Sequence, residues 1–247
     1  MEELTNRKYN ILGMSSCRLD YVGFRGSNPN VGYKRWASLP YATLLEVENQ
    51  IKQLYWTKDP VPEHDFLHLE ICTLKYANPH IDPNNKLRST GRDLYLNYQQ
   101  FEMYMDNILS IIPINIKLIV HTCHNITLSD KAYDLIKNAL IEKQYTKMLG
   151  GGGNTGEHPE IACESLTLDK KFKRREICEQ YVCSYFSGTR SERTTVIKTS
   201  DVFKDWDSDR VFLHSKDKSK IDTFHYTEQA KHHIREQSIE HTKHLFI

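Results

Sequence analysis

The chain lacks the features of a membrane or nucleic-acid-binding protein. No apolar run in its 247 residues approaches the roughly 18 residues that a membrane-spanning helix needs. Lysine and arginine total 33 against 32 aspartates and glutamates, which gives a formal net charge of +1. This balance argues against a general nucleic-acid or anionic-membrane surface. We therefore expect neither a membrane nor a nucleic acid as a partner.

The sequence also contains no disulfide framework and no linker. Its six cysteines show no Cys-x-x-Cys pair, and several lie in apolar strand or helix patterns, so we interpret them as reduced thiols, mostly in the core. The first ten residues are polar and charged, unlike a signal peptide, and we expect a cytoplasmic protein. Glycine (11) and proline (8) are few, without a Gly/Ser/Pro-rich linker. The sequence therefore predicts one domain over residues 1–247.

Strand-like and helix-like segments alternate along the chain. Strands are expected at 9–12, 66–72, 114–120 and 194–198, and helices at 44–55, 101–112, 130–140, 170–186 and from Thr227 onward. The glycine- and asparagine-rich stretch 21–36 is expected to be a loop. This alternation predicts a single doubly wound, flavodoxin-like domain with three α/β/α layers and a mostly parallel sheet. In such sheets ligands bind beyond the carboxyl ends of the strands.

The first expected strand runs into Gly13-Met14-Ser15-Ser16-Cys17-Arg18. A strand–turn–helix context of this kind suits a nucleophile, because backbone N–H groups and the helix dipole favour developing negative charge. Most serine-rich stretches of this kind are ordinary helix caps. Cys17 beside Arg18 is also a chemically sensible nucleophile, since its thiolate is favoured there. The choice between Ser15 and Cys17 stays open, with Ser16 as the third candidate.

A second candidate segment is Asp222-Thr223-Phe224-His225-Tyr226-Thr227. In a tight turn that enters a helix, the Asp222 carboxylate would bond one ring nitrogen of His225 and leave the other nitrogen available as a base. Asp-x-x-His turns also arise from helix-entry chemistry alone. This segment, residues 13–18, the stretch after Cys72 and residues 121–125 all follow expected strands. We therefore predict that the four border one crevice.

Taken together, the two segments resemble the SGNH (GDSL-type) hydrolase superfamily, as a divergent member. Gly13-Met14-Ser15 after a strand is similar to the first block of that family, and Asp222-x-x-His225 with Thr227 two positions on is similar to its last block. The resemblance implies ester hydrolysis or acyl transfer on a small-molecule or glycan ester, often an acetylated carbohydrate. It implies no cofactor and no metal.

The resemblance also implies roles for individual residues. Ser15 or Cys17 would attack the ester carbonyl, His225 would serve as general base and then acid, and Asp222 would orient it. The residues expected to contact the substrate or its oxyanion are Gly13, Ser16, Arg18, Asn78 and Asn125.

One block of the family pattern is missing. The family carries Gly-x-Asn after the middle strand, whereas the equivalent stretch here is Glu70-Ile71-Cys72-Thr73-Leu74-Lys75. Losing one oxyanion donor costs on the order of 3 kcal/mol, so we expect a substitute from Asn78, Asn125 or a backbone N–H of residues 26–32. The alternative is a catalytically lapsed SGNH-like binding or structural protein.

His121-Thr122-Cys123-His124 raises the question of a zinc site. Imidazole and thiolate are good zinc ligands, but a single cluster without a distant partner pair is insufficient evidence. We interpret one of these histidines as a hydrogen-bonded wall residue and predict no metal.

Overall fold

Five parallel strands form the central layer of the computed structural model, which describes residues 8–15, 30–39, 43–57, 60–76, 96–122, 125–141, 168–214 and 221–246. The strands are β1 (Tyr9–Ser15), β2 (Val31–Ser38), β3 (Phe66–Ile71), β4 (Lys117–Thr122) and β5 (Thr194–Ile197). Their order in the sheet is β2-β1-β3-β4-β5, and all of these pairings are parallel.

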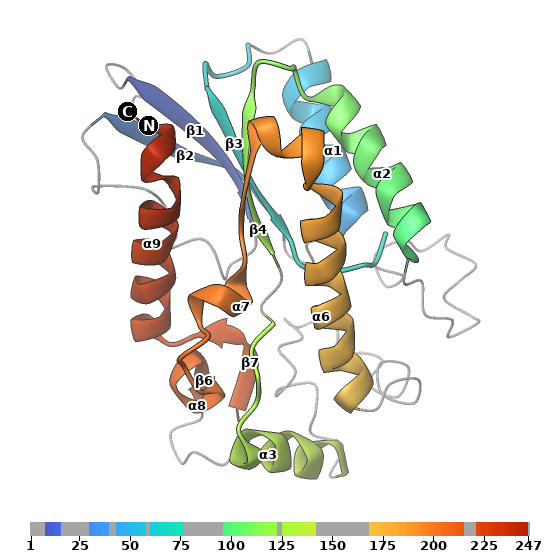
Figure 1. The fold of residues 1–247 in the computed structure, drawn as a ribbon, viewed down its shortest axis with the longest axis vertical. Coiled ribbons are helices and arrows are strands. Elements are labelled where there is room, and N and C mark those ends of the chain that lie inside the picture. The colour runs from blue at the N-terminus through green and yellow to red at the C-terminus, as the bar shows by residue number, and fades with distance from the viewer. Residues whose placement is uncertain are drawn as a thin grey trace.

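Helices cover both faces of this sheet (Figure 1). On one face lie α1 (Leu44–Trp56), α2 (Tyr98–Ile111) and α6 (Leu168–Tyr185). On the other lie α7 (Thr199–Val202), α8 (Ser208–Val211), α9 (Glu228–Thr242) and the antiparallel pair β6 (Phe212–His214) and β7 (Ile221–Tyr226). The helix α3 (Asp130–Ile141) follows β4, and short 3₁₀ helices span Gly188–Arg193 and Lys243–Leu245. The predicted three-layer α/β/α fold is confirmed.

The burial of the β3 side chains shows that the sheet is covered on both faces. All six of its residues are buried, as expected for a strand of a parallel sheet between two helical layers. Leu67, Leu69 and Ile71 join the core beneath α1, α2 and α6, whereas Phe66 joins the core beneath α9. Because side chains alternate along a strand, His68 and Glu70 share the face of Phe66.

The helix starts follow from capping residues in the sequence. Thr43 and Glu46 form a capping box at the start of α1, and Asn97 and Gln100 form another at α2. The Thr227 hydroxyl accepts the Ala230 N–H at the start of α9, which confirms the predicted start of the last helix. Each such cap contributes on the order of 1 kcal/mol.

Three expected boundaries were wrong. Residues 31–36, predicted as part of a loop, belong to the edge strand β2, whose half-exposed, charged residues lack an apolar run. β4 begins at Lys117 rather than at 114, because Pro113 and Asn115 lie in the turn before it. β1 continues to Ser15, so residues 13–15 belong to the strand and not to a turn.

The cysteines that the structure describes lie in or near the interior, as predicted. Cys178 is buried in the core, and Cys72 and Cys183 are half-buried. Cys17, Cys123 and Cys163 lie outside the described residues. Within the described ranges, no helix combines the length and apolar character needed to cross a membrane.

A chain of buried polar groups crosses the sheet beneath α9. The Tyr33 hydroxyl lies 3.2 Å from His68 Nδ1, and His68 Nε2 lies 2.6 Å from His121 Nδ1. His121 Nε2 lies 2.9 Å from Ser238 Oγ, which donates to the Ile234 carbonyl at 2.5 Å. The two imidazoles and Ser238 are fully buried. We call these four side chains, Tyr33, His68, His121 and Ser238, the polar chain.

The Ile234 carbonyl sets the direction of every proton in the polar chain. Because Ser238 donates to that carbonyl, its oxygen accepts from His121 Nε2–H, and His121 Nδ1 must then accept from His68 Nε2–H. His68 Nδ1 consequently accepts the Tyr33 O–H. This assignment requires both rings to be neutral. Burial agrees with this assignment, since it lowers the pKa of His68 to about 3 and the pKa of His121 well below 6.5.

We predict that the polar chain makes stability fall in mild acid. The folded protein keeps both imidazoles neutral, whereas the unfolded chain takes up protons as the pH falls below 6.5. Stability is therefore complete above about pH 6.5 and decreases toward pH 3, by up to about 1.4 kcal/mol per pH unit for each histidine. Urea unfolding measured from pH 7 to pH 4 would give the slope. The same slope in a His68→Gln/His121→Gln variant would contradict the assignment.

Candidate functional site

The strand order places a switch point between β1 and β3. β2, which follows β1 in the chain, lies on one side of it, and β3 lies on the other. In a doubly wound sheet with this order, ligands bind beyond the carboxyl ends of the two strands at that point. The carboxyl end of β1 is Ser15, and that of β3 is Ile71.

Ser15 lies at this edge, and the burial of its hydroxyl group is unusual. Its side chain is fully buried, and its Oγ has no hydrogen-bond partner among the described residues. The backbone is held in place, because the Ser15 carbonyl accepts the Leu39 N–H at 3.0 Å. A buried polar group without a partner costs about 1–3 kcal/mol, so its presence calls for an explanation. Attack on a bound substrate is one such explanation.

A buried carboxylate lies next to Ser15 along the sheet edge. Met14 pairs with Leu69, so the following residues, Ser15 and Glu70, are neighbours on adjacent strands and share the α9 face. Glu70 is 2 % exposed and pairs in register with His121 on β4. Glu70 lies in the stretch where the SGNH pattern has Gly-x-Asn. A carboxylate, which accepts hydrogen bonds, therefore stands in a region where that pattern supplies the N–H donor of an asparagine.

Gly13 makes room for the polar chain. A Cβ atom at position 13 would lie 1.9 Å from the Tyr33 hydroxyl oxygen and 2.5 Å from its Cζ. The glycine therefore lets Tyr33 reach from β2 over β1 to His68 on β3. This contact gives Gly13 a packing role inside the strand; its role at the substrate stays a prediction.

We predict that Gly13→Ala destabilises the protein by roughly 1–3 kcal/mol, because the Tyr33 ring must move and leave His68 without its donor. Chemical denaturation would measure the loss. In a Tyr33→Val background the same substitution should cost little, since the ring that it meets is gone. An equal cost in both backgrounds would contradict this explanation.

A second buried carboxylate organises the carboxyl ends of β4 and β5. Glu179 on α6 accepts from the Thr122 hydroxyl at 2.6 Å and from the Ser200 backbone N–H at 3.3 Å. Its other oxygen accepts from the Ser200 hydroxyl and from Asn125 Nδ2, the latter at 3.4 Å. Asn125, one of the predicted oxyanion donors, thus directs its amide toward Glu179. Its catalytic role stays a prediction.

We predict that Glu179→Gln destabilises the protein by about 2–3 kcal/mol. Four donors face the carboxylate, and an amide in its place would point an N–H group at some of them. Glu176→Gln, on the same helix, is the matched control because Glu176 pairs with Lys173 at the surface. Equal melting temperatures for the two variants would contradict the prediction.

The Asp222–His225 segment is a bulged strand rather than the predicted turn. Leu213 pairs with Asp222 and the neighbouring Phe212 pairs with Tyr226, so β7 advances four residues where β6 advances one. Residues 223–225 therefore form a bulge, and His225 within it is half-buried. Bulges re-aim side chains and are frequent next to active sites. The proposed bond between Asp222 and His225 stays a prediction.

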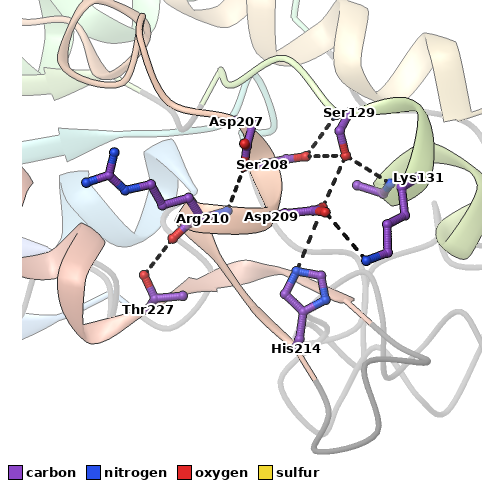
Figure 2. A network of polar contacts seen from close by, with 9 residues as sticks. Ser129, Lys131, Asp207, Ser208, Asp209, Arg210, His214 and Thr227 are labelled. Carbon is purple, nitrogen blue, oxygen red and sulfur yellow. Dashed lines mark hydrogen bonds and ion pairs between the residues drawn. The ribbon is translucent and has the colours of Figure 1, made fainter.

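Another acid–histidine pair joins Asp209 of α8 and His214 of β6, the strand that neighbours β7 (Figure 2). Asp209 Oδ1 accepts from the Ser129 hydroxyl at 3.1 Å, and His214 Nε2 lies 3.9 Å from the same oxygen. Lys131 Nζ lies 3.9 Å from Asp209 Oδ2. The His214 distance is too long for a hydrogen bond, so the carboxylate does not orient this ring as a catalytic pair requires.

The same junction joins α3 to α8. Ser129 Oγ accepts the Ala132 N–H at 3.1 Å, and the buried Ser208 hydroxyl accepts the Ser129 N–H at 2.8 Å. These bonds cap α3 and place it beyond the carboxyl end of β4, where Figure 1 also shows α8 and the β6–β7 hairpin. We interpret the junction as structural support for that edge of the sheet.

Several predicted site residues are not described. Ser16, Cys17, Arg18 and Asn78 lie outside the described residues, as do Cys123 and His124. In the part of the chain that is described, no group of three His, Cys, Asp or Glu side chains has the arrangement of a metal site. His121 uses both ring nitrogens within the polar chain.

Sequence reasoning missed His68 and Glu179. His68 lies inside an apolar strand, where a histidine is most simply a core residue. Glu179 lies in a strongly charged helix, but it neighbours Cys178 and is three residues before Val182, both of which are buried. An acidic residue on the apolar face of a helix is the signal that would have identified it.

Comparisons with known proteins support the fold alone. No family model matches the chain, and no curated protein matches its sequence. Among solved structures, it is similar to the salicylyl-acyltransferase SsfX3 from a tetracycline biosynthetic pathway, with a TM-score of 0.50 and 10 % sequence identity. The similarity covers 98 % of this chain and 56 % of that protein, so the chain spans about half of its length.

Proposed function

We propose that the protein is an esterase or acyltransferase of SGNH type that acts on a small acyl ester, with acetylated carbohydrate as the expected substrate class. The observation that carries the proposal is the Ser15 hydroxyl at the β1–β3 switch point, which is buried and has no hydrogen-bond partner among the described residues. A nucleophile must be held in place yet keep its oxygen available for the substrate. The similar solved structure is an acyltransferase by name, which is support by analogy of fold only.

The proposed reaction has two steps. Ser15 Oγ, or Cys17 Sγ, attacks the ester carbonyl while His225 takes its proton and passes it to the departing alcohol. Water or another hydroxyl compound then attacks the acyl-enzyme, gives its proton to His225, and the proton returns to the nucleophile as the acyl group leaves. Asp222 would stabilise the imidazolium. The position of His225 on a bulge just before α9 supports this role.

A binding protein that has lost catalysis is the second candidate. The carboxyl end of β3 favours it, because a buried Glu70 stands in the stretch that would hold an oxyanion donor. A carboxylate near a developing oxyanion raises the barrier rather than lowering it.

Turnover of p-nitrophenyl acetate separates the two candidates. We expect His225→Ala to lower kcat/KM by about 10²- to 10⁴-fold, the usual contribution of a general base. His232→Ala is the matched control, since His232 is 70 % exposed on α9 and pairs with Glu236. Turnover that does not depend on His225, or no turnover at all, would favour the binding protein.

Chemical labelling identifies the nucleophile in the same preparations. A fluorophosphonate reacts with an activated serine and iodoacetamide with an activated cysteine. Loss of fluorophosphonate labelling in Ser15→Ala alone would assign Ser15, and loss of iodoacetamide labelling in Cys17→Ser alone would assign Cys17.

A further inference from the structure

The polar chain joins the two parts of the proposed site. At one end, Tyr33 lies against Gly13, two residues before Ser15 in β1. At the other end, Ser238 and the Ile234 carbonyl belong to α9, whose N-cap Thr227 is two residues after His225. The chain between them crosses β3 and β4 through His68 and His121. Continuous hydrogen bonds therefore join β2, β3 and β4 to α9, the helix after the proposed base. Tyr33 connects them to β1, the strand with the proposed nucleophile, only by packing against Gly13.

The polar chain has the properties of a positioning device and not of a catalyst. Its Ser238 is fully buried and donates to a helix carbonyl, so this hydroxyl is not a nucleophile. Each ring nitrogen of His68 and His121 is already in contact within the chain, which leaves no site for exchange of a proton with a substrate. The role that the polar chain can serve is to hold α9 against β2, β3 and β4 through directional hydrogen bonds.

We propose that Tyr33, His68, His121 and Ser238 act as positioning residues that hold α9, and with it His225, in place relative to Ser15. The inference rests on the proposed function for its catalytic consequence. A shift of about 1 Å between reacting groups costs on the order of 100-fold in rate. The sheet alone does not prevent such a shift, because β7 pairs with β6 and not with the five-stranded sheet.

The chain contains a matched control for this idea. Tyr55 hydroxyl lies 2.8 Å from His64 Nε2, and His64 Nδ1 lies 2.7 Å from the Pro62 carbonyl. This is also a series of phenol, imidazole and carbonyl, with a half-buried tyrosine, but it lies before β3, at the amino edge of the sheet. Tyr33→Phe and Tyr55→Phe thus remove the same group from two similar series, one that crosses the sheet beneath α9 and one that lies before β3.

Hydrogen–deuterium exchange of the full chain tests the positioning without relying on activity. We expect Tyr33→Phe and Ser238→Ala to raise the exchange of peptides covering residues 221–234 several-fold, and Tyr55→Phe to leave those peptides unchanged. The Tyr33→Phe result is the decisive one, since residue 33 lies on β2, at the far side of the sheet from β4 and β5. If its effect is confined to β2 and β3, the polar chain is local packing and the proposal is overturned.

Kinetics test the catalytic consequence. We expect Tyr33→Phe and Ser238→Ala to lower kcat for p-nitrophenyl acetate at least tenfold with little change in KM, and Ser238→Thr to recover most of the loss. Tyr55→Phe should lower the melting temperature by a similar amount and leave kcat unchanged. A wild-type protein without turnover would contradict the proposed function while the exchange result still decides the link between β2 and α9. Equal kcat losses in Tyr33→Phe and Tyr55→Phe would overturn the positioning role.

Discussion

The parallel pairing of β1 with β2 on one side and β3 on the other is the constraint on which the site depends. It buries β1, brings Ser15 to the carboxyl edge, and places that edge where the strand order reverses. Parallel strands need crossover connections, and these put helices on both faces of the sheet. In doubly wound sheets ligands bind beyond the carboxyl ends of the strands at such a point, which here are Ser15 and Ile71.

The α9 side of the molecule has a different organisation from the α1–α2–α6 side. Beneath α9, two neutral histidines bonded to each other lie across the middle strands of the sheet, whereas the buried polar pair on the α6 side, Glu179 and Thr122, lies at the carboxyl end of β4. Burying such groups without partners costs several kcal/mol, so the polar chain has to be complete to be tolerated. A polar chain in which every group has a hydrogen-bond partner also fixes one arrangement of its side chains, which purely apolar contacts do not do. This is the physical reason for linking the polar chain to the geometry of the site.

The fold was predictable from the sequence because its signals are local. The apolar run of β3 and the helical spacing of apolar residues in α1 and α2 each identify an element without reference to the rest of the chain. β2 was missed because an edge strand needs no apolar run, and the β7 bulge because it depends on the register with β6.

The site was predictable only in outline. The position of Ser15 at a strand end follows from the motif. The Gly13–Tyr33 contact does not, because Tyr33 lies in a stretch that the sequence predicts to be a loop. The bonds of Glu179 to Thr122 and of His68 to His121 connect residues more than 50 positions apart. Such contacts depend on tertiary packing, and a single sequence does not contain them.

Trapping the acyl-enzyme tests the central claim most directly. The protein would be mixed briefly with p-nitrophenyl acetate, quenched in acid and digested, and the acetylated peptide identified by mass spectrometry. The proposed chemistry predicts one acetyl group on residue 15, 16 or 17. This acetylated protein should accumulate in His225→Ala no faster than in the unmodified chain. Acetylation confined to surface lysines, with residues 15–17 unmodified, would contradict it.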